Sequence, residues 1–409
     1  MKRGINGFQP ERLQQVLSAR RLSQIQLATM IGMAPSTVSK WKAGTQAPDA
    51  AALERLAFVV NVAQEWFTRP ISAEITPPLY RSNASAHAAA RAMLAARTEW
   101  AQDVALALEE FMDFPAVNIP ARGFLSSDDI SQQDIEAAAQ ECRDAWGLGS
   151  GPIPDVSLAL ENAGVILVRE ETGTVKIEGL STWAHPLNRP IVLLVADKGN
   201  AFRGRFDAAH ELGHLMLHKS IPATRAAAGH AEMEQQAHAF AGAFLLPAET
   251  FAGEVRLPVT LDSLLLLKQR WGASVGAMIM RLRALDIIND FGKTALFKQR
   301  SARWGAKSEP GDSSRQPETP RMLRRAVELV LDAGIMTIDG VARHFGLSER
   351  DVESLTGLPA LFLDGKGDVV ELPKLKDASN RVLAPREGGA EGKGQVLPFS
   401  PVRRPLRSA

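Results

Sequence analysis

Two histidines four residues apart, His210 and His214, constrain this chain more than any other feature of its sequence. On an α-helix, residues with this spacing lie on one face, so both imidazoles can bind a single metal ion. Glu211 projects from the neighbouring side of the same turn, where it can take a proton from a metal-bound water. Two imidazoles and a carboxylate, with a fourth position open for water, suit zinc. The pattern therefore predicts a Zn2+ site with Glu211 as the general base.

The alternative for this helix is an amphipathic segment whose histidines are only hydrogen-bonded near the core. Apolar residues fill the gaps of the pattern, at Ala208, Ala209, Leu212, Leu215, Met216 and Leu217. A helix of this composition is expected to be largely buried, and buried ionisable groups are costly without a compensating partner. That cost favours the metal site.

The helix expected over residues 231–247 is the best source of the third ligand. Its apolar stripe consists of Met233, Ala237, Phe240 and Phe244. Glu234 lies along the edge of this stripe, whereas Glu232 falls with Gln236 on the opposite side, which is expected to be solvated. Packing therefore turns Glu234 inward, and we prefer it to Glu232 as the third ligand.

Three further residues are candidates for supporting roles. His218 continues the metal helix but turns about 40° further from the histidine pair every four residues, so we interpret it as structural or as a hydrogen-bond partner of a ligand. His238, one turn beyond the inward glutamate, could support a ligand or stabilise an oxyanion. Asp207, one turn before the first histidine, could orient that imidazole.

Length and composition limit the class of protein. A chain of 409 residues has room for two or three domains. Cys142 is the only cysteine, so no intrachain disulfide can form and a reducing cytoplasm is expected. The N-terminus lacks an apolar stretch typical of a signal peptide, and no run of about 18 apolar residues is present. We therefore expect a soluble cytoplasmic protein that makes no membrane contact.

Residues 8–67 have the pattern of a bundle of short helices. Ser23 can cap one helix and Gly32 can end it, and a second short helix then runs to Lys42. Two short helices joined by a tight turn are typical of a helix-turn-helix, which presents the second helix to the major groove. Residues 1–45 hold seven Lys and Arg against Glu11 alone, a local net charge of +6 that is compatible with DNA. The alternative is a helical bundle that binds protein.

The same segment resembles the Cro/XRE-type helix-turn-helix family. The resemblance rests on Leu22-Ser-Gln-Ile-Gln-Leu-Ala28, Ile31-Gly32, Ser36-Thr-Val-Ser-Lys-Trp41 and Gly44…Pro48. It implies a five-helix DNA-binding domain, usually a homodimer on a palindromic site. In this chain it implies that the bases face Pro35, Ser36, Ser39 and Lys40. It also implies that Gln24 holds a phosphate.

The rest of the chain predicts an α+β multidomain protein. A linker and a long helix occupy 68–134, and a domain with a small sheet occupies 135–285, with strands near 165–168, 175–183 and 191–195. An edge of that sheet beside the metal could hold an extended peptide by backbone hydrogen bonds. The C-terminal region, 318–365, is expected to be helical.

Two segments of the C-terminal third could form a second helix-turn-helix, residues 261–281 and 337–352, but neither has a basic recognition face, which favours ordinary helix packing. Residues 301–320 and the tail, 374–409, are rich in Gly, Pro, Ser and charge and are expected to be disordered.

Residues 135–285 resemble the ImmA/IrrE metallopeptidase family. The resemblance rests on Arg205–His218, Glu234–Pro247, the Trp146-Gly-Leu-Gly motif and the strands before the metal helix. It implies a zincin-like, zinc-dependent endopeptidase whose substrates include transcriptional repressors, and fusion to a Cro/XRE domain is typical of the family. His238 departs from the asparagine expected at its position.

Two other functions stay open. One is a non-proteolytic regulator, antitoxin-like or stress-responsive, whose metal site is structural or sensory. The other is a regulator that cleaves itself in a linker such as residues 68–82.

Overall fold

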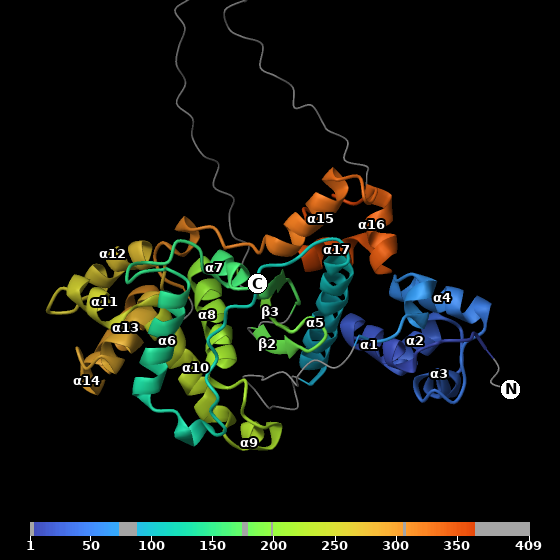
Figure 1. Ribbon diagram of the computed structural model, residues 1–409. Coiled ribbons are helices and arrows are strands. Elements are labelled where there is room, and N and C mark those ends of the chain that lie inside the picture. The colour runs from blue at the N-terminus through green and yellow to red at the C-terminus, as the bar shows by residue number, and fades with distance from the viewer. Residues whose placement is uncertain (1–3, 73–87, 174–178, 198, 306–307, 365–409) are drawn as a thin grey trace, which may run out of the picture. The chain divides into compact units, whose positions relative to one another are not determined.

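The computed structural model describes residues 4–72, 88–173, 179–197, 199–305 and 308–364 (Figure 1). The expected tail, residues 374–409, and most of the linker 68–82 lie outside the described residues. Among the described residues, no helix is long and apolar enough to cross a membrane.

The N-terminal helices form the predicted helix-turn-helix bundle. They are α1 (Pro10–Arg20), α2 (Gln24–Met30), α3 (Pro35–Lys42), α4 (Ala50–Val60) and the 3-10 helix η1 (Gln64–Thr68). Ser23 and Gln26 form a capping box at the start of α2, and Asp49 caps α4. Leu27, Val38 and Trp41 turn into the bundle core, which fixes the outward face of α3.

A three-stranded sheet lies between the two cores of the described chain. Its strands are β1 (Ile166–Glu170), β2 (Gly179–Ala184) and β3 (Arg189–Val195). The strand order is β1-β3-β2, with β1 parallel and β2 antiparallel to β3, so β2 is an edge strand. The fold is therefore the predicted mixture of helices with a small sheet.

Successive strand residues face opposite sides, so the sheet contributes to two hydrophobic cores. Ile166, Val168 and Ile191 join one core with the N-terminal bundle, the long helix α5 (Ala88–Glu109) and the C-terminal helices. Leu167, Val192 and Leu194 join the other core. The helices of that second core include α6 (Gln132–Ala145), α7 (Val156–Asn162), α8 (Ala201–Leu217), α10 (His230–Leu245), α11 (Ala248–Glu254), α12 (Leu261–Trp271), α13 (Val275–Ala284) and α14 (Asp290–Trp304).

The expectation that residues 301–320 are disordered is wrong, because most of them are ordered and their side chains contact other helices. Glu309 accepts hydrogen bonds from the backbone of Val275 (2.8 Å) and Gly276 (3.0 Å) at the start of α13. Glu318 accepts from the backbone of Val156 (2.9 Å) at the start of α7. A polar composition predicted disorder, but these carboxylates satisfy helix N-termini that would otherwise have unpaired N–H groups.

Three helices complete the first core, α15 (Met322–Asp332), α16 (Ile338–Phe345) and α17 (Glu349–Thr356). Short helices also occur at η3 (Ser127–Asp129), α9 (Ala223–Ala228) and η4 (Asp312–Ser314). Helices α16 and α17 have the shape of a helix-turn-helix. However, Asp351, Val352 and Leu355 of α17 are buried against α5 and β1, so this helix packs inside the protein and cannot enter a DNA groove.

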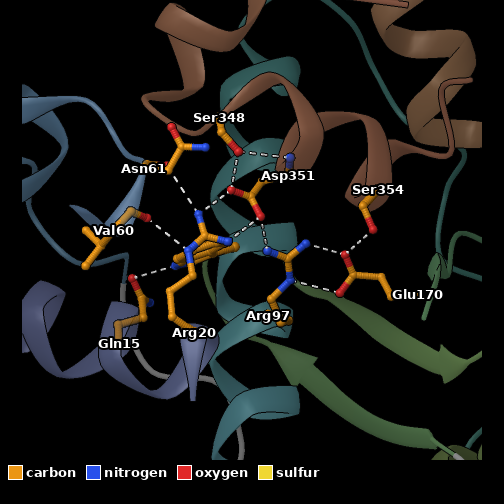
Figure 2. Close-up of polar contacts among 10 residues, drawn as sticks. Gln15, Arg20, Val60, Asn61, Arg97, Glu170, Ser348, Asp351 and Ser354 are labelled. Carbon is orange, nitrogen blue, oxygen red and sulfur yellow. Dashed lines mark hydrogen bonds and ion pairs between the residues drawn. The ribbon is translucent and has the colours of Figure 1, made fainter. Parts of the chain in front are cut away.

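A buried chain of alternating charges joins four of these elements (Figure 2). Arg97 of α5 donates to Glu170 of β1 (2.9 Å) and to Asp351 of α17 (2.6 Å), and Arg20 of α1 donates to the same aspartate (2.8 Å). Ser354 donates to Glu170 (2.8 Å). Burial alone raises the pKa of Asp351, but hydrogen bonds from Arg20 and the charge of Arg97 outweigh it and lower that pKa to about 2. The network therefore connects the N-terminal helical bundle to the sheet.

Candidate metal centre

Helix α8 carries the histidine pair through the second core. Asn200 caps its start by accepting from the backbone of Arg203 (3.0 Å). Both imidazoles are buried, with His210 7% and His214 3% exposed. A Cβ on Gly213 would lie 3.2 Å from the Cα of Ala237, so this glycine allows α8 and α10 to approach closely. That approach places Glu234 of α10 opposite the pair.

The three donors lie at metal-binding distances from one another. His210 Nε2 is 3.1 Å from His214 Nε2. Glu234 contributes one carboxylate oxygen 3.4 Å from His210 Nε2 and the other 3.3 Å from His214 Nε2. Donors bound at about 2.0–2.1 Å to a tetrahedral zinc lie roughly 3.3–3.4 Å apart. Two imidazole nitrogens and a carboxylate with this spacing fit a zinc ion, and among the described residues His210, His214 and Glu234 form a group that could hold a metal ion.

The protonation states of the group also suit a metal. Burial raises the pKa of the Glu234 carboxyl, but its contacts with His210 and His214 outweigh burial and hold that pKa below its usual range. Burial lowers the pKa of His214. An ionised carboxylate and a neutral imidazole are the forms that ligate a cation.

The other nitrogen of His214 begins a buried chain of hydrogen bonds. His214 Nδ1 lies 2.9 Å from His218 Nδ1, and His218 Nε2 lies 3.1 Å from Gln236 Oε1. Gln236 Nε2 donates to the carbonyl of Ser127 (2.9 Å) and, more weakly, to that of Ile130 (3.4 Å). His218 thus lies beside a candidate ligand and outside the three-donor group.

The expectation that Gln236 is solvated is wrong, because this side chain is only 6% exposed. Helix α10 is enclosed by α6, α8 and α13, so the side opposite its apolar stripe is also covered. A helical projection could not find Gln236, since it assumes that one face meets water. Glu232, by contrast, is exposed.

The Glu211 carboxylate lies beside the first residue of the edge strand. A Cβ added to Gly179 would lie 3.1 Å from Glu211 Oε1, so the absence of a side chain there makes room for the acid. Glu211 is 5% exposed. This glycine was not identified from the sequence, where it falls inside the strand expected over residues 175–183 and no local pattern relates it to Glu211.

The remaining candidates are His238 and Asp207. His238 Nδ1 is 2.6 Å from the backbone carbonyl of Glu234, and its ring centroid is 4.4 Å from that of His210. Its Nδ1 therefore donates to the backbone. The Asp207 carboxylate is 3.9 Å from Arg203 Nε.

The expected DNA-binding residues lie on or beside α3. Pro35, Ser36, Ser39 and Lys40 are exposed. Gln24 is half-buried, and its amide donates to the carbonyl of Pro35 (2.8 Å), so it joins α2 to the start of α3. The geometry leaves the outward face of α3 accessible.

Comparison with known families gives two matches. Residues 13–63 match the helix-turn-helix family model, and residues 160–283 match the IrrE N-terminal-like domain, Peptidase_M78. No curated protein matches the chain. Together with the fold, these matches support a DNA-binding regulator that carries a domain of a metallopeptidase family. More narrowly, the matches support an ImmA/IrrE-type protein with an N-terminal Cro/XRE-type helix-turn-helix domain.

Proposed function

We propose that the chain is a DNA-binding regulator with a zinc-dependent endopeptidase that cleaves a regulatory protein such as a repressor. The observation that carries the proposal is the spacing of the three donors, His210, His214 and Glu234. A bound zinc ion would act there as a Lewis acid that polarises a peptide carbonyl and makes water more acidic. These three residues would hold the ion.

The protein's own residues then supply the proton transfers and the positioning. Glu211, next to the donors but outside their group, would take a proton from the attacking water and return it to the leaving amine. The edge strand β2 starts beside the Glu211 carboxylate, so a substrate added along β2 in extended form would bring its backbone to this acid. His238 Nδ1 donates to a backbone carbonyl, so its Nε2 would donate to an oxyanion in the imidazolium form, in which both ring nitrogens carry protons.

Removal of the metal tests the peptidase. We expect a chelator to abolish cleavage of a proteome-derived peptide library by the full chain, and stoichiometric zinc to restore it, with magnesium as the control that does not. Mass spectrometry of the cleaved library reports both the loss and the recovery. Cleavage that continues unchanged in the metal-free chain would contradict the proposal.

The regulator part would bind DNA through α3, with Ser36, Ser39 and Lys40 toward the bases and Gln24 at the backbone. The homodimer implied by the Cro/XRE resemblance remains a prediction.

We expect Lys40→Ala to weaken binding to a duplex selected from a random pool by about 1–3 kcal/mol, measured by fluorescence anisotropy at several salt concentrations. Lys298→Ala removes the same charge from an exposed position of α14 and should leave affinity unchanged. Equal effects of the two variants would argue against α3 as the recognition helix.

A further inference from the structure

We propose that Gln236 is a positioning residue that fixes the tautomer of His214 through His218, and so keeps the His214 nitrogen that faces His210 and Glu234 free of a proton. This inference rests on the proposed zinc site. It concerns side chains that lie behind the donors, on the side of α10 turned toward the segment that contains η3.

The chain of hydrogen bonds starts at two backbone carbonyls, which can only accept. The carbonyls of Ser127 and Ile130 both face Gln236 Nε2, at 2.9 Å and 3.4 Å. A flipped amide would place its oxygen against these two oxygens, so the orientation is determined by its surroundings. The amide oxygen therefore points toward His218 and can only accept.

Each later bond then has one direction. Because Gln236 Oε1 accepts, His218 Nε2 must carry a proton and donate across 3.1 Å. A neutral imidazole protonated at Nε2 has a lone pair at Nδ1, which faces His214 Nδ1 at 2.9 Å. His214 must then donate from Nδ1, which leaves its Nε2 with the lone pair. That Nε2 is the atom 3.3 Å from the Glu234 carboxylate.

Because these side chains are buried, they depend on one another for their hydrogen bonds. His218 is 2% exposed and Gln236 6% exposed, so water is poorly placed to replace a missing partner. A histidine ligand usually donates its second N–H to a carboxylate, a carbonyl or water, and loss of that partner typically lowers metal affinity 10- to 100-fold. Here the partner is another histidine, and the glutamine beyond it sets the direction of both bonds.

The test compares three variants of the full chain by competition for zinc with a chromophoric chelator. Gln236→Leu removes the acceptor and is expected to weaken zinc binding about 10- to 100-fold. Gln236→Glu keeps an acceptor for His218, and its second oxygen, protonated in this buried position, can donate to the Ser127 carbonyl as Nε2 does, so it should stay closer to the wild type than the leucine variant. Gln235→Leu, the same change at the exposed neighbouring position, should have no effect.

A second measurement needs no variant. Nitrogen-15 NMR of histidine-labelled wild-type chain, without zinc, should show His214 protonated at Nδ1 and His218 at Nε2. The opposite tautomer at His214, or an affinity of Gln236→Leu within twofold of the wild type, would overturn the inference. If the wild type shows these tautomers but does not bind zinc, the proposed peptidase is contradicted and the hydrogen-bond chain is supported.

Discussion

Replacement of Glu211 by glutamine is expected to lower the rate of peptide cleavage by about 10²- to 10⁴-fold, the usual contribution of a general base. The amide has nearly the shape of the carboxylate, so it should fit beside Gly179 as the acid does, but it cannot accept the proton of the attacking water. His210, His214 and Glu234 are unchanged, so the zinc content should stay at the wild-type level. Cleavage of the peptide library and elemental analysis measure the two quantities on the same preparation.

Glu232→Gln is the matched control, because it makes the same acid-to-amide change at an exposed position of α10. It should leave both cleavage and zinc unchanged. Undiminished cleavage by Glu211→Gln would remove Glu211 from the mechanism.

Unchanged regulation in cells carrying Glu211→Gln would favour a regulator whose metal is structural or sensory. Self-cleavage of the wild type that Glu211→Gln abolishes would identify the chain as its own substrate.

Arg97→Met is expected to destabilise the folded chain by about 3–5 kcal/mol, the usual effect of removing one partner from a buried ion pair. The guanidinium lies between two buried carboxylates, Glu170 (4% exposed) and Asp351 (5% exposed). Asp351 keeps Arg20 as a partner, whereas Glu170 keeps only the neutral hydroxyl of Ser354 from the network in Figure 2. Methionine fills the space but leaves a buried charge poorly compensated. Urea unfolding followed by tryptophan fluorescence measures the loss.

The tryptophans of this core are well placed to report that transition, since Trp100 and Trp66 pack edge to face at 5.7 Å. Arg324→Met is the control, because it removes an arginine from an exposed pair with Glu328 and should cost at most about 1 kcal/mol. Adding Glu170→Gln to Arg97→Met should recover part of the lost stability. A loss below about 1 kcal/mol for Arg97→Met alone would show that the charge network does not hold these elements together.

Local sequence patterns were sufficient to predict most of the helices and strands and both family resemblances. Spacing along one helix paired His210 with His214, and the apolar stripe of another helix turned Glu234 toward the same side. The alternation of the strands and the caps of α2 and α4 likewise depend on neighbours in sequence, which is why the fold class and both family resemblances could be predicted and are confirmed.

Features that depend on distant neighbours could not be predicted. Gln236 is buried because η3 and α6 cover a helix face that a helical projection assigns to water. Gly179 makes room for the carboxylate of Glu211, which lies 32 positions later in the sequence. Residues 301–320 are ordered because their acids cap helices elsewhere in the chain, and no composition rule contains that information.

Elemental analysis of the purified, metal-replete full chain measures whether His210, His214 and Glu234 hold a zinc ion. We expect one zinc ion per chain in the wild type, and loss of that ion at micromolar free zinc when Glu234 is replaced by alanine, while Glu232→Ala retains it. A well-folded wild type that holds no stoichiometric divalent ion, or a Glu234→Ala variant that keeps its zinc, would contradict this expectation.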